Sequence, residues 1–512
     1  MKKLLILALL AIIAPKVATA ASWFNWQEVA GVASGIITDT AHWSSDPAGS
    51  TSPDDYLQFS LAAEYTVTIP QGSAYTSLMR PFITAHDGHA VTFDGDGASW
   101  TQPDSPSGNY NASRIQFRLA APDVSNSDIF LIQGAADTSG GFKMTDPLIK
   151  ASGEDSPAYR LDFLRGTYNF YDPNGTARSM SAYLRGVTGV TDATVRFGEG
   201  AALNAHELKY GVSSDARAFV FDGGTHIINN GISFDASAAG RSRLLATNGA
   251  ELQIPATVAL VETHPFDFQV QSNAVLKITG SKTFKFGSAA AAAAYDAKLT
   301  VSNAVIVVDA GSSFYNYGKM QVVNSRVSAA QLNLYSGVSC FKDSAVTSAY
   351  DDVSYDATII VDGGIYVSTD VFRMNYNGSG SALVVTNGGE FVYSKTIDSP
   401  DISRGATSSS SIFVRGGKFK TVDYTGITVR PLLLGRNGGT GTTTLELSSG
   451  EIALGNRPLS VGGRDVTVTV SGGTYQGSSI FFNSYENSAD HESLFHQTGG
   501  EIALSPYSTY LD

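Results

Sequence analysis

The sequence Ile-Ile-Val-Asp-Gly-Gly-Ile-Tyr at residues 359–366 decides the fold, because its pattern recurs along the chain. It consists of a short apolar strand, a glycine pair and a second apolar segment. The same arrangement stands at 384–391 (VVTNGGEF), 413–419 (FVRGGKF) and 468–475 (VTVSGGTY). Two later copies, at 450–454 and 500–504, share the sequence GEIAL. Such recurrence predicts one repetitive body and not a series of unrelated domains.

Weaker copies extend the pattern towards the N-terminus, at 221–227 (FDGGTHI) and 247–252 (TNGAEL). More eroded ones stand at 309–314 (DAGSSF) and 336–341 (SGVSCF), and residues 273–276 (NAVL) fall where a copy is missing. Several steps between the first glycines are about 26 residues, and a loose period of this size is typical of a stacked solenoid. Blades of a propeller and units of a β-sandwich are longer.

Each repeat is too short to bury a core alone, so the strands are expected to pair with the coils above and below. Residues 465–470 (DVTVTV) alternate with a period of two, as a half-buried strand does. The glycine pairs, and Asn248 and Asn387 before glycine, suit corners with positive φ. We therefore predict an all-β, right-handed, single-stranded parallel β-helix. The alanines at 289–294 and the serines at 408–411 are interpreted as loops leaving this body.

Composition limits the classes of partner. The 512 residues include 34 Lys and Arg against 47 Asp and Glu, for a net charge of −13. An acidic chain with scattered basic residues is a poor ligand for phosphate backbones, so no nucleic-acid partner is predicted. A hydrophobic content of 43% is ample for a core.

The N-terminus has the pattern of a removable signal peptide. Lys2 and Lys3 precede an apolar run at 4–14, and Ala18-Thr19-Ala20 is a small-x-small cleavage pattern. The expected organisation is a signal peptide at 1–20, an N-terminal cap with the first coils at 21–110, and β-helix repeats at 111–512. The mature chain is predicted to be secreted or displayed at the cell surface, without a transmembrane segment. The lone Cys340 is interpreted as a small buried hydrophobe, with a reactive thiol as the alternative.

Three stretches resemble the right-handed β-helices of bacterial autotransporter-like and pectin-lyase-like surface proteins. The first is residues 41–44 (AHWS), 52–56 (SPDDY) and 65–69 (YTVTI), although His42 stands where that family usually has Asn. The second is 434–450, which resembles the family's L-G-x-x-G-x-G-T repeat, and the third is the set of Gly-Gly turns. The resemblance implies a β-helix. The family includes adhesins, structural passengers and polysaccharide enzymes, so the resemblance does not imply one function. No translocating barrel is expected. The sequence stops at 510–512 soon after a repeat turn and without a polar cap, which a solenoid needs, so we expect a truncated gene product or a chain completed by a partner.

Polysaccharide hydrolysis needs two or three carboxylates on one face. The adjacent pairs Asp54-Asp55 and Asp351-Asp352 are the candidates for this role. Neither is followed by the His-Gly and Arg-x-Lys elements of such enzymes, so surface loop or cap is preferred. Residues 93–97 (FDGDG) fit either a Ca²⁺ site or a turn, and the turn is preferred since Ser105 occupies the twelfth loop position. Residues 86–89 (HDGH) are read as an exposed turn and not a metal site.

His491, Glu492 and His496 miss the zinc-helix spacing, and the glycine-rich 435–441 precedes an expected strand, not a phosphate-binding helix. No catalytic, cofactor-binding or metal-binding residue is predicted, and no cofactor.

Two functions remain open. The preferred one is a non-enzymatic, exported β-helix that acts as an adhesin-like or structural passenger module, with glycans or surface proteins as partners and an open oligomeric state. The alternative is a polysaccharide-processing lyase or glycoside hydrolase with a diverged active site. The abundant aromatics, 23 Tyr and 26 Phe, would mostly stack in the core, but rows of outward tyrosines would suit a glycan platform.

Overall fold

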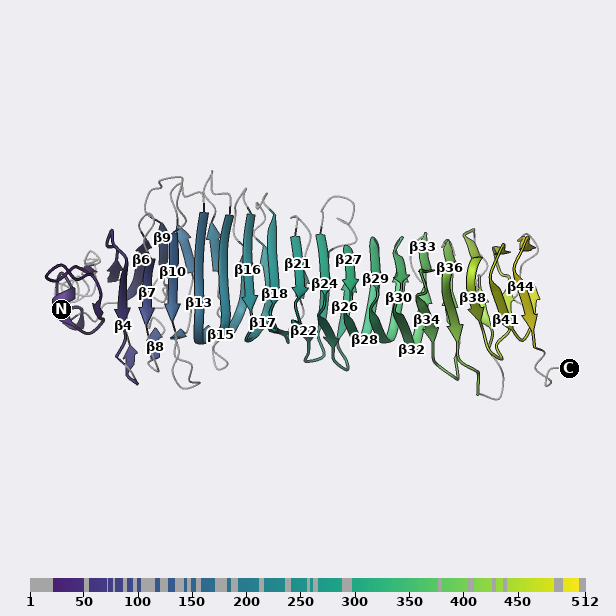
Figure 1. Ribbon diagram of the computed structural model, residues 1–512, viewed down its shortest axis with the longest axis horizontal. Coiled ribbons are helices and arrows are strands. Elements are labelled where there is room, and N and C mark those ends of the chain that lie inside the picture. The colour runs from purple at the N-terminus through teal and green to yellow at the C-terminus, as the bar shows by residue number, and fades with distance from the viewer. Residues whose placement is uncertain are drawn as a thin grey trace, which may run out of the picture.

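The computed structural model describes most of residues 22–505 and shows a right-handed parallel β-helix drawn out into a rod (Figure 1). The segments outside the described residues are 1–21, 50–54, 71, 77–78, 86–89, 95–98, 103–115, 120–127, 134–141, 145–148, 153–157, 171–181, 186–191, 211–215, 235–240, 256–257, 261–265, 288–296, 376–379, 399, 404–406, 408, 426–429, 436–439, 483–490 and 506–512. The predicted fold class is confirmed. The signal peptide and the alanine run lie outside the described residues.

Strands of successive coils pair in parallel and form three long ladders, which we call ladders A, B and C. Ladder A begins each coil and contains β4 (Tyr65–Thr68), β7 (Ala90–Asp94), β10 (Asp128–Gln133), β13 (Ala158–Phe170), β15 (Asp192–Tyr210), β16 (Ala216–Asp222), β18 (Ser242–Thr247), β21 (Phe266–Gln271), β24 (Ala297–Ser302), β27 (Lys319–Val323), β29 (Val338–Lys342), β31 (Thr358–Asp362), β33 (Ser381–Thr386), β36 (Ser410–Thr421), β38 (Thr442–Ala453), β40 (Asp465–Val470) and β43 (Ser493–Gln497).

Ladder B follows the first corner of each coil and includes the later parts of β13, β15, β36 and β38. Its other strands are β5 (Ala74–Thr76), β8 (Ser99–Gln102), β11 (Phe142–Met144), β17 (Thr225–Phe234), β19 (Glu251–Ile254), β22 (Val275–Ile278), β25 (Val305–Val308), β28 (Arg326–Tyr335), β30 (Ala345–Ser354), β32 (Ile365–Met374), β34 (Glu390–Tyr393), β41 (Thr474–Gly477) and β44 (Glu501–Leu504).

Ladder C closes the later coils and includes the ends of β28, β30 and β32. Its other strands are β20 (Val258–Leu260), β23 (Thr283–Phe286), β26 (Ser313–Asn316), β35 (Asp401–Ile402), β37 (Leu432–Leu434), β39 (Leu459–Val461) and β42 (Ile480–Phe482).

A cap of mixed structure covers the N-terminal end. It contains β1 (Trp23–Asn25), β2 (Gly35–Ile36) and the 3₁₀ turns η1 (Thr40–His42) and η2 (Pro47–Gly49). Trp26 stacks on His42 at a ring-centroid distance of 4.8 Å and meets Trp43 edge-on at 5.1 Å. The sheet of β1, β3 (Tyr56–Phe59), β6 (Arg80–Ala85) and β9 (Gln116–Leu119) lies beside the first coils, and β12 (Ile149–Ser152) pairs with β14 (Ala182–Arg185).

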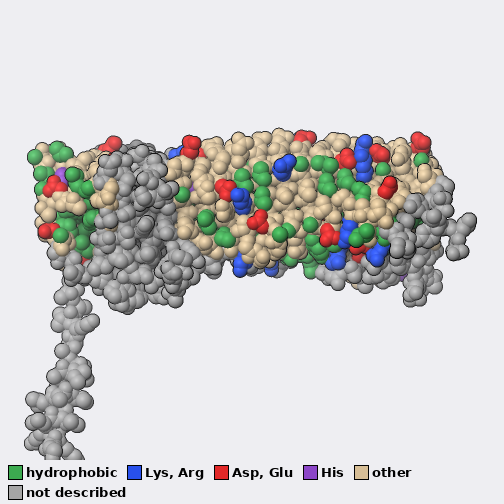
Figure 2. Space-filling model, turned by 90° about the horizontal axis from the view of Figure 1, so that it is seen from below, with side chains coloured by type: hydrophobic (Ala, Val, Ile, Leu, Met, Phe, Trp, Pro, Cys, Tyr) green, Lys and Arg blue, Asp and Glu red, His purple; other side chains and the backbone are tan. Residues whose placement is uncertain are grey.

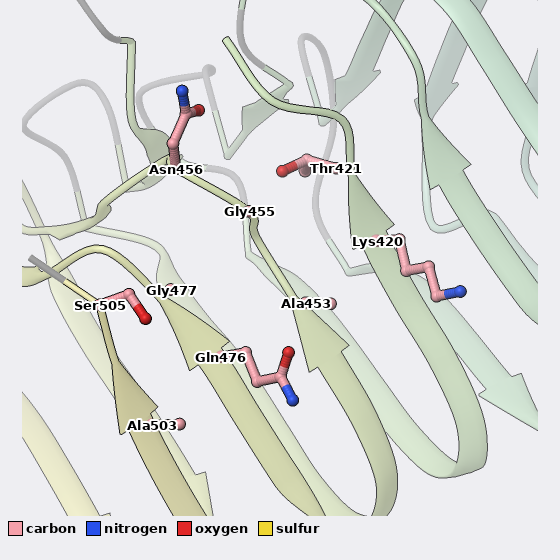
Figure 3. A pocket seen from close by; sticks show the side chains of 9 residues that line it. All are labelled: Lys420, Thr421, Ala453, Gly455, Asn456, Gln476, Gly477, Ala503 and Ser505. Carbon is pink, nitrogen blue, oxygen red and sulfur yellow. The ribbon is translucent and has the colours of Figure 1, made fainter. Parts of the chain in front are cut away.

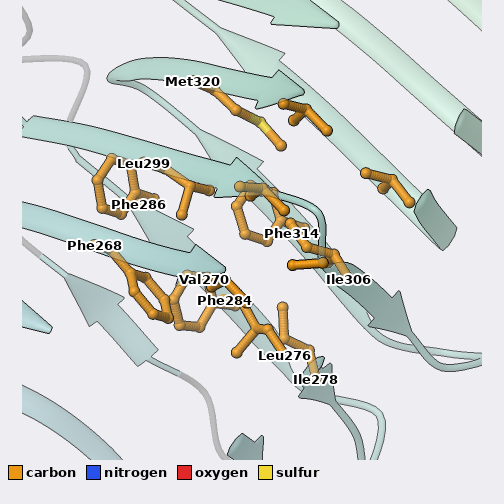
Figure 4. Close-up of a cluster of buried hydrophobic side chains, with 14 of the residues drawn as sticks. Phe268, Val270, Leu276, Ile278, Phe284, Phe286, Leu299, Ile306, Phe314 and Met320 are labelled. Carbon is orange, nitrogen blue, oxygen red and sulfur yellow. The ribbon is translucent and has the colours of Figure 1, made fainter. Parts of the chain in front are cut away.

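The core is a set of side-chain columns that run along the axis (Figure 4). In ladder B one column places Tyr366, Phe391 and Phe419 on successive coils, with neighbouring ring centroids 5.5 and 5.3 Å apart. Phe284 stacks on Phe314 in ladder C at 5.3 Å. Each inward residue thus buries its side chain against the equivalent residue of the next coil, which is where the solenoid's hydrophobic stabilisation arises.

The corner between ladders A and B is turned by residues of positive φ, as the sequence predicted for its glycines and for Asn248 and Asn387. The left-handed residues at this corner include Gly223, Asn248, Asn273, Asn303, Asn324, Asp343, Gly363, Asn387, Gly416, Gly450, Gly473 and Gly500. The missing copy at 273–276 is confirmed, because Asn273 turns the corner into β22.

Two of the eroded copies were placed at the wrong corner. Gly311 lies between β25 and β26, at the corner from ladder B to ladder C, and Gly337 lies between β28 and β29. The first corners of these coils carry Asn303, Asn324 and Asp343 instead, so a search for glycine misses them. Asp343 and Gly363 turn successive corners, which shows that these coils are shorter than the repeat read from the sequence.

Two further expectations were wrong. Ser410 and Ser411 are not in an outward loop but begin β36, where they pair with Ser381 and Ala382. Cys340 is half-buried in β29 between the inward residues Ser339 and Phe341, so it faces outwards and is not a core residue. Burial raises the pKa of its thiol, which works against the reactive-thiol alternative.

Candidate functional site

Five tyrosines gather on the outer face of ladder C, across the three shortest coils. This tyrosine cluster consists of Tyr315, Tyr317, Tyr335, Tyr350 and Tyr355. Tyr315 comes from β26, Tyr335 and Tyr350 from β28 and β30, and Tyr317 and Tyr355 from the corners that follow. The four that share ring contacts form one aromatic surface, to which Tyr350 is joined through a charged neighbour described below.

The rings pack in a defined geometry. Tyr315 and Tyr317 are nearly parallel, with an interplanar angle of 11° and centroids 6.5 Å apart. Tyr335, on the next coil, meets both edge-on with centroids 5.4 Å away, and Tyr355 meets Tyr335 edge-on at 5.3 Å. Edge-to-face contacts of this kind are favourable arrangements of aromatic quadrupoles, so the rings support one another.

Polar side chains lie beneath the rings in one register column. Tyr315, Asn333, Asp352 and Arg373 occupy equivalent positions on successive coils. Leu332 and Leu334 on either side of Asn333 point into the core, so Asn333 and its column partners face outwards. Asn333 is nevertheless fully buried, and Asp352, which Tyr335 contacts, is only 5% exposed.

Asp352 is held by two hydroxyls. Tyr335 Oη donates to its Oδ2 at 3.0 Å, and Ser354 Oγ donates to its Oδ1 at 2.6 Å. Burial raises the pKa of Asp352, and these bonds and the nearby Arg373 only partly offset that effect. Burial and the charge of Asp352 also raise the pKa of Tyr335, which therefore stays a hydrogen-bond donor at physiological pH.

Cations stand at both ends of the column. Lys285, one coil before Tyr315, has its Nζ 5.8 Å from the centre of the Tyr315 ring. Arg373 lies 5.3 Å from the ring of Tyr350 and donates from Nη1 to the Tyr350 hydroxyl at 2.7 Å. Cation–π contacts of this kind hold the rings in place at the rim of the cluster.

Tyr355 has a strained backbone. Its φ is 57°, in the left-handed region that a bulky side chain rarely adopts, and Asp356 follows at 65°. The equivalent corner one coil earlier is turned by Ser336 and Gly337. With 39% of its surface exposed, Tyr355 gains little from burial that would offset this strain. Strain of this sort is a marker of functional positions.

The pair Asp351-Asp352 does not form a catalytic pair, because the two side chains leave β30 on opposite faces. Asp351 lies in the core column between Leu332 and Phe372, fully buried, and accepts a hydrogen bond from Tyr366 Oη at 2.6 Å. Burial raises its pKa to about 6, although hydroxyls of Ser368, Tyr366 and Ser348 act in the opposite direction.

The other sequence-derived candidates are not brought together with this cluster. Asp55 accepts from the backbone N–H of Ser22 at 2.7 Å and so fastens the cap, while Asp54 lies outside the described residues. The segment 86–89 and Asp96 also lie outside them, and Asp94 ends β7. His496 is in strand β43, not a helix, and His491 Nδ1 lies 3.6 Å from Asp465 Oδ1. Residues 435–441 precede strand β38, as expected.

One buried titratable residue escaped the sequence reasoning. His226 occupies the ladder B core column between Leu203 and Leu252 and is fully buried. Its Nε2 bonds the carbonyl oxygen of Gly223 at 2.7 Å, and burial lowers its pKa to about 4. The imidazole is therefore a neutral core residue at physiological pH. Its position inside the repeat FDGGTHI, where other copies have Tyr or Phe, is the signal that would have found it.

A groove of about 670 Å³ lies on the outer side of the last coils (Figure 3). It is lined by Lys420, Thr421, Ala453, Gly455, Asn456, Gln476, Gly477, Ala503 and Ser505. Several of its polar groups already have partners: Asn456 Nδ2 donates to Tyr424 O at 2.9 Å, and Thr421 Oγ1 donates to Leu454 O at 2.8 Å. Lys420 Nζ pairs with Glu390 at 3.0 Å. These bonds shape the corner, and the described residues that line the groove include no carboxylate.

Figure 2 shows one long face of the rod, on which Lys and Arg side chains lie beside Asp and Glu. Ion pairs between coils include Lys277–Glu251 at 2.8 Å and Lys418–Glu451 at 3.3 Å. Within the described ranges, no cluster of His, Cys, Asp and Glu is placed to hold a metal ion. That same part of the chain contains no helix long and apolar enough to cross a membrane.

Comparisons with known proteins found no relative of this chain. The chain matched no protein-family model, no curated protein and no solved structure.

Proposed function

We propose that this protein is an exported, non-enzymatic β-helix of the autotransporter-like or pectin-lyase-like kind, which acts as an adhesin-like surface module. The observation that carries the proposal is the tyrosine cluster on the outside of ladder C. Half-exposed tyrosines offer apolar ring faces together with hydroxyls, which suits them to contact with a surface or a polymer. Glycans are the partners that such a platform fits best.

The position of the carboxylates supports a binding role over a hydrolytic one. Retaining or inverting hydrolysis uses two carboxyl groups that flank one glycosidic bond. Asp351 points into the core and Asp352 points outwards, so β30 offers only one of them to a ligand. The lone outward carboxylate is suited to accept hydrogen bonds.

The test is a panel of immobilised polysaccharides and surface proteins, probed with beads that carry the chain from residue 22 onwards, with and without Ca²⁺. Retention and the release of cleavage products are both scored. We expect retention without cleavage, and a loss of retention in Tyr317→Ala and Tyr355→Gly. Phe413→Ala is the matched control, since it removes an outward aromatic of ladder A. Cleavage of any polymer, or retention that survives both tyrosine substitutions, would overturn the proposal.

A further inference from the structure

Asn333, the register partner of Tyr315 in the tyrosine cluster, has a buried amide nitrogen without a hydrogen-bond acceptor among the described residues. Asn333 Oδ1 accepts from Gln331 Nε2 at 3.4 Å, but Asn333 Nδ2 donates to no atom of the described residues. The side chain is fully buried. A buried polar group without a partner costs about 1–3 kcal/mol, so the position is unfavourable for folding alone.

The adjacent coil presents the complementary group. Asp352 is the register partner of Asn333, and coils of a parallel ladder are about 4.8 Å apart. An N–H donor and a carboxylate acceptor therefore stand one above the other, facing outwards. The hydroxyl of Tyr335 donates to Asp352 Oδ2 at 3.0 Å.

We infer that Asn333 and Asp352 together bind a neutral hydroxyl of a carbohydrate. This inference rests on the proposed adhesive function and names its ligand class. A hydroxyl accepts and donates at once, so a single one can accept from Asn333 Nδ2 and donate to Asp352 Oδ2. It replaces the Tyr335 hydroxyl, which turns outwards to solvent. The C–H face of the sugar ring packs against the exposed rings of Tyr317 and Tyr355.

The chemistry of the site selects against other contact groups. A phosphate or carboxylate placed at this point would lie beside the carboxylate of Asp352 and be repelled. An alkyl chain would leave Asn333 Nδ2 unpaired in a dry site. A hydroxyl is the group that satisfies both partners without adding charge.

The decisive variant is Asn333→Leu, which has nearly the same volume and removes the unpaired amide. If Asn333 served only the fold, this variant would leave binding unchanged. We expect a higher melting temperature together with about tenfold weaker retention of neutral oligosaccharides, since one net hydrogen bond is lost. Gln321→Leu, at an outward and exposed position of β27, is the matched control and is expected to change neither.

Tyr335→Phe tests the exchange of hydroxyls separately. It keeps the ring and removes the group that competes for Asp352, so retention should be tighter. The probe is an array of neutral and acidic oligosaccharides, with immobilised surface proteins as a second arm. Wild-type affinity in Asn333→Leu, or weakening in Tyr335→Phe as large as in Asn333→Leu, would overturn the inference. If only surface proteins are retained, in a manner that depends on Tyr317 and Tyr355, the carbohydrate is wrong and the adhesive function stands.

Discussion

Asp351 and Asp352 are neighbours in β30, yet one carboxyl is sealed in the core against Tyr366 and the other lies on the outside beneath Tyr335. The alternation of a strand is sufficient to explain this separation. It gives the two carboxyls different surroundings, because the inner group is enclosed by core residues and the outer group bonds the hydroxyls of Tyr335 and Ser354.

Asp351→Asn is expected to stabilise the protein at neutral pH. The folded state raises the pKa of this carboxyl from 3.8 to about 6, so the folded state binds the proton more tightly than the unfolded chain. Stability should therefore fall as pH rises from 3.8 through about 6, by roughly 3 kcal/mol when the change is complete. The variant lacks this loss, which urea unfolding between pH 3.5 and 7.5 would reveal, since that range spans the shift. Exposed Asp309→Asn is the control; a wild-type pH slope in Asp351→Asn would refute the assignment.

His226→Leu should remove a pH dependence of stability whose sign is opposite to that caused by Asp351. The pKa of His226 falls from 6.5 to about 4 on folding, so the unfolded chain takes up the proton first. Stability is complete above pH 6.5 and is lost as pH falls towards 4, again by roughly 3 kcal/mol. In the wild type the two residues offset each other over nearly the same range. We expect the stability of His226→Leu relative to the wild type, measured by chemical denaturation, to be higher at pH 4.5 than at pH 7.5. Exposed His496→Gln is the control and should show no such difference.

Gly364→Ala and Gly388→Ala separate backbone strain from steric clash. Both glycines have positive φ, 66° and 78°. A Cβ at Gly364 would collide with the backbone of Ser344 on the preceding coil, whereas one at Gly388 meets nothing within 4 Å. Gly388→Ala should cost about 1–2 kcal/mol from strain alone, and Gly364→Ala clearly more. Equal losses, measured by thermal unfolding, would show that coils do not approach as closely at this corner as the structure indicates.

Phe391→Ala should destabilise the column in which it lies. Its ring is fully buried between Tyr366 and Phe419, so truncation leaves a cavity with rings on both sides. Losses of about 3–5 kcal/mol are usual for such a change. Phe413→Ala, on the outer side of ladder A, is expected to lose much less, and chemical denaturation of the two variants is the comparison. If both variants unfold at the same denaturant concentration, the inward and outward assignment of β36 is wrong.

The sequence was sufficient to predict the coil, because each strong copy combines a period of two with a glycine corner. It failed where a different residue performs the same task. Asn303, Asn324 and Asp343 turn the first corner in the short coils, while glycine recurs at the other corners as Gly311 and Gly337. Without the correct corner, the coil length in this region is misread.

The same error hides the tyrosine cluster. Tyr350 and Tyr366 look alike in the sequence, but one is outside and the other inside, and only the register distinguishes them. The steps between Tyr315, Tyr335 and Tyr350 are unequal, so no period brings them together. Asn333 is beyond sequence reasoning for a related reason, since only the register shows that it lies between Tyr315 and Asp352 in ladder C.

Parallel pairing gives the rod an uncommon response to load. Among the described residues, the strands of each coil pair with strands of the coil before it and the coil after it. A force that pulls one terminus along the axis therefore acts on the hydrogen bonds of one coil at a time. The protein should unfold coil by coil, in a series of small extension steps, and not in a single event. The shortest coils would release the least chain, and those coils bear the tyrosine cluster.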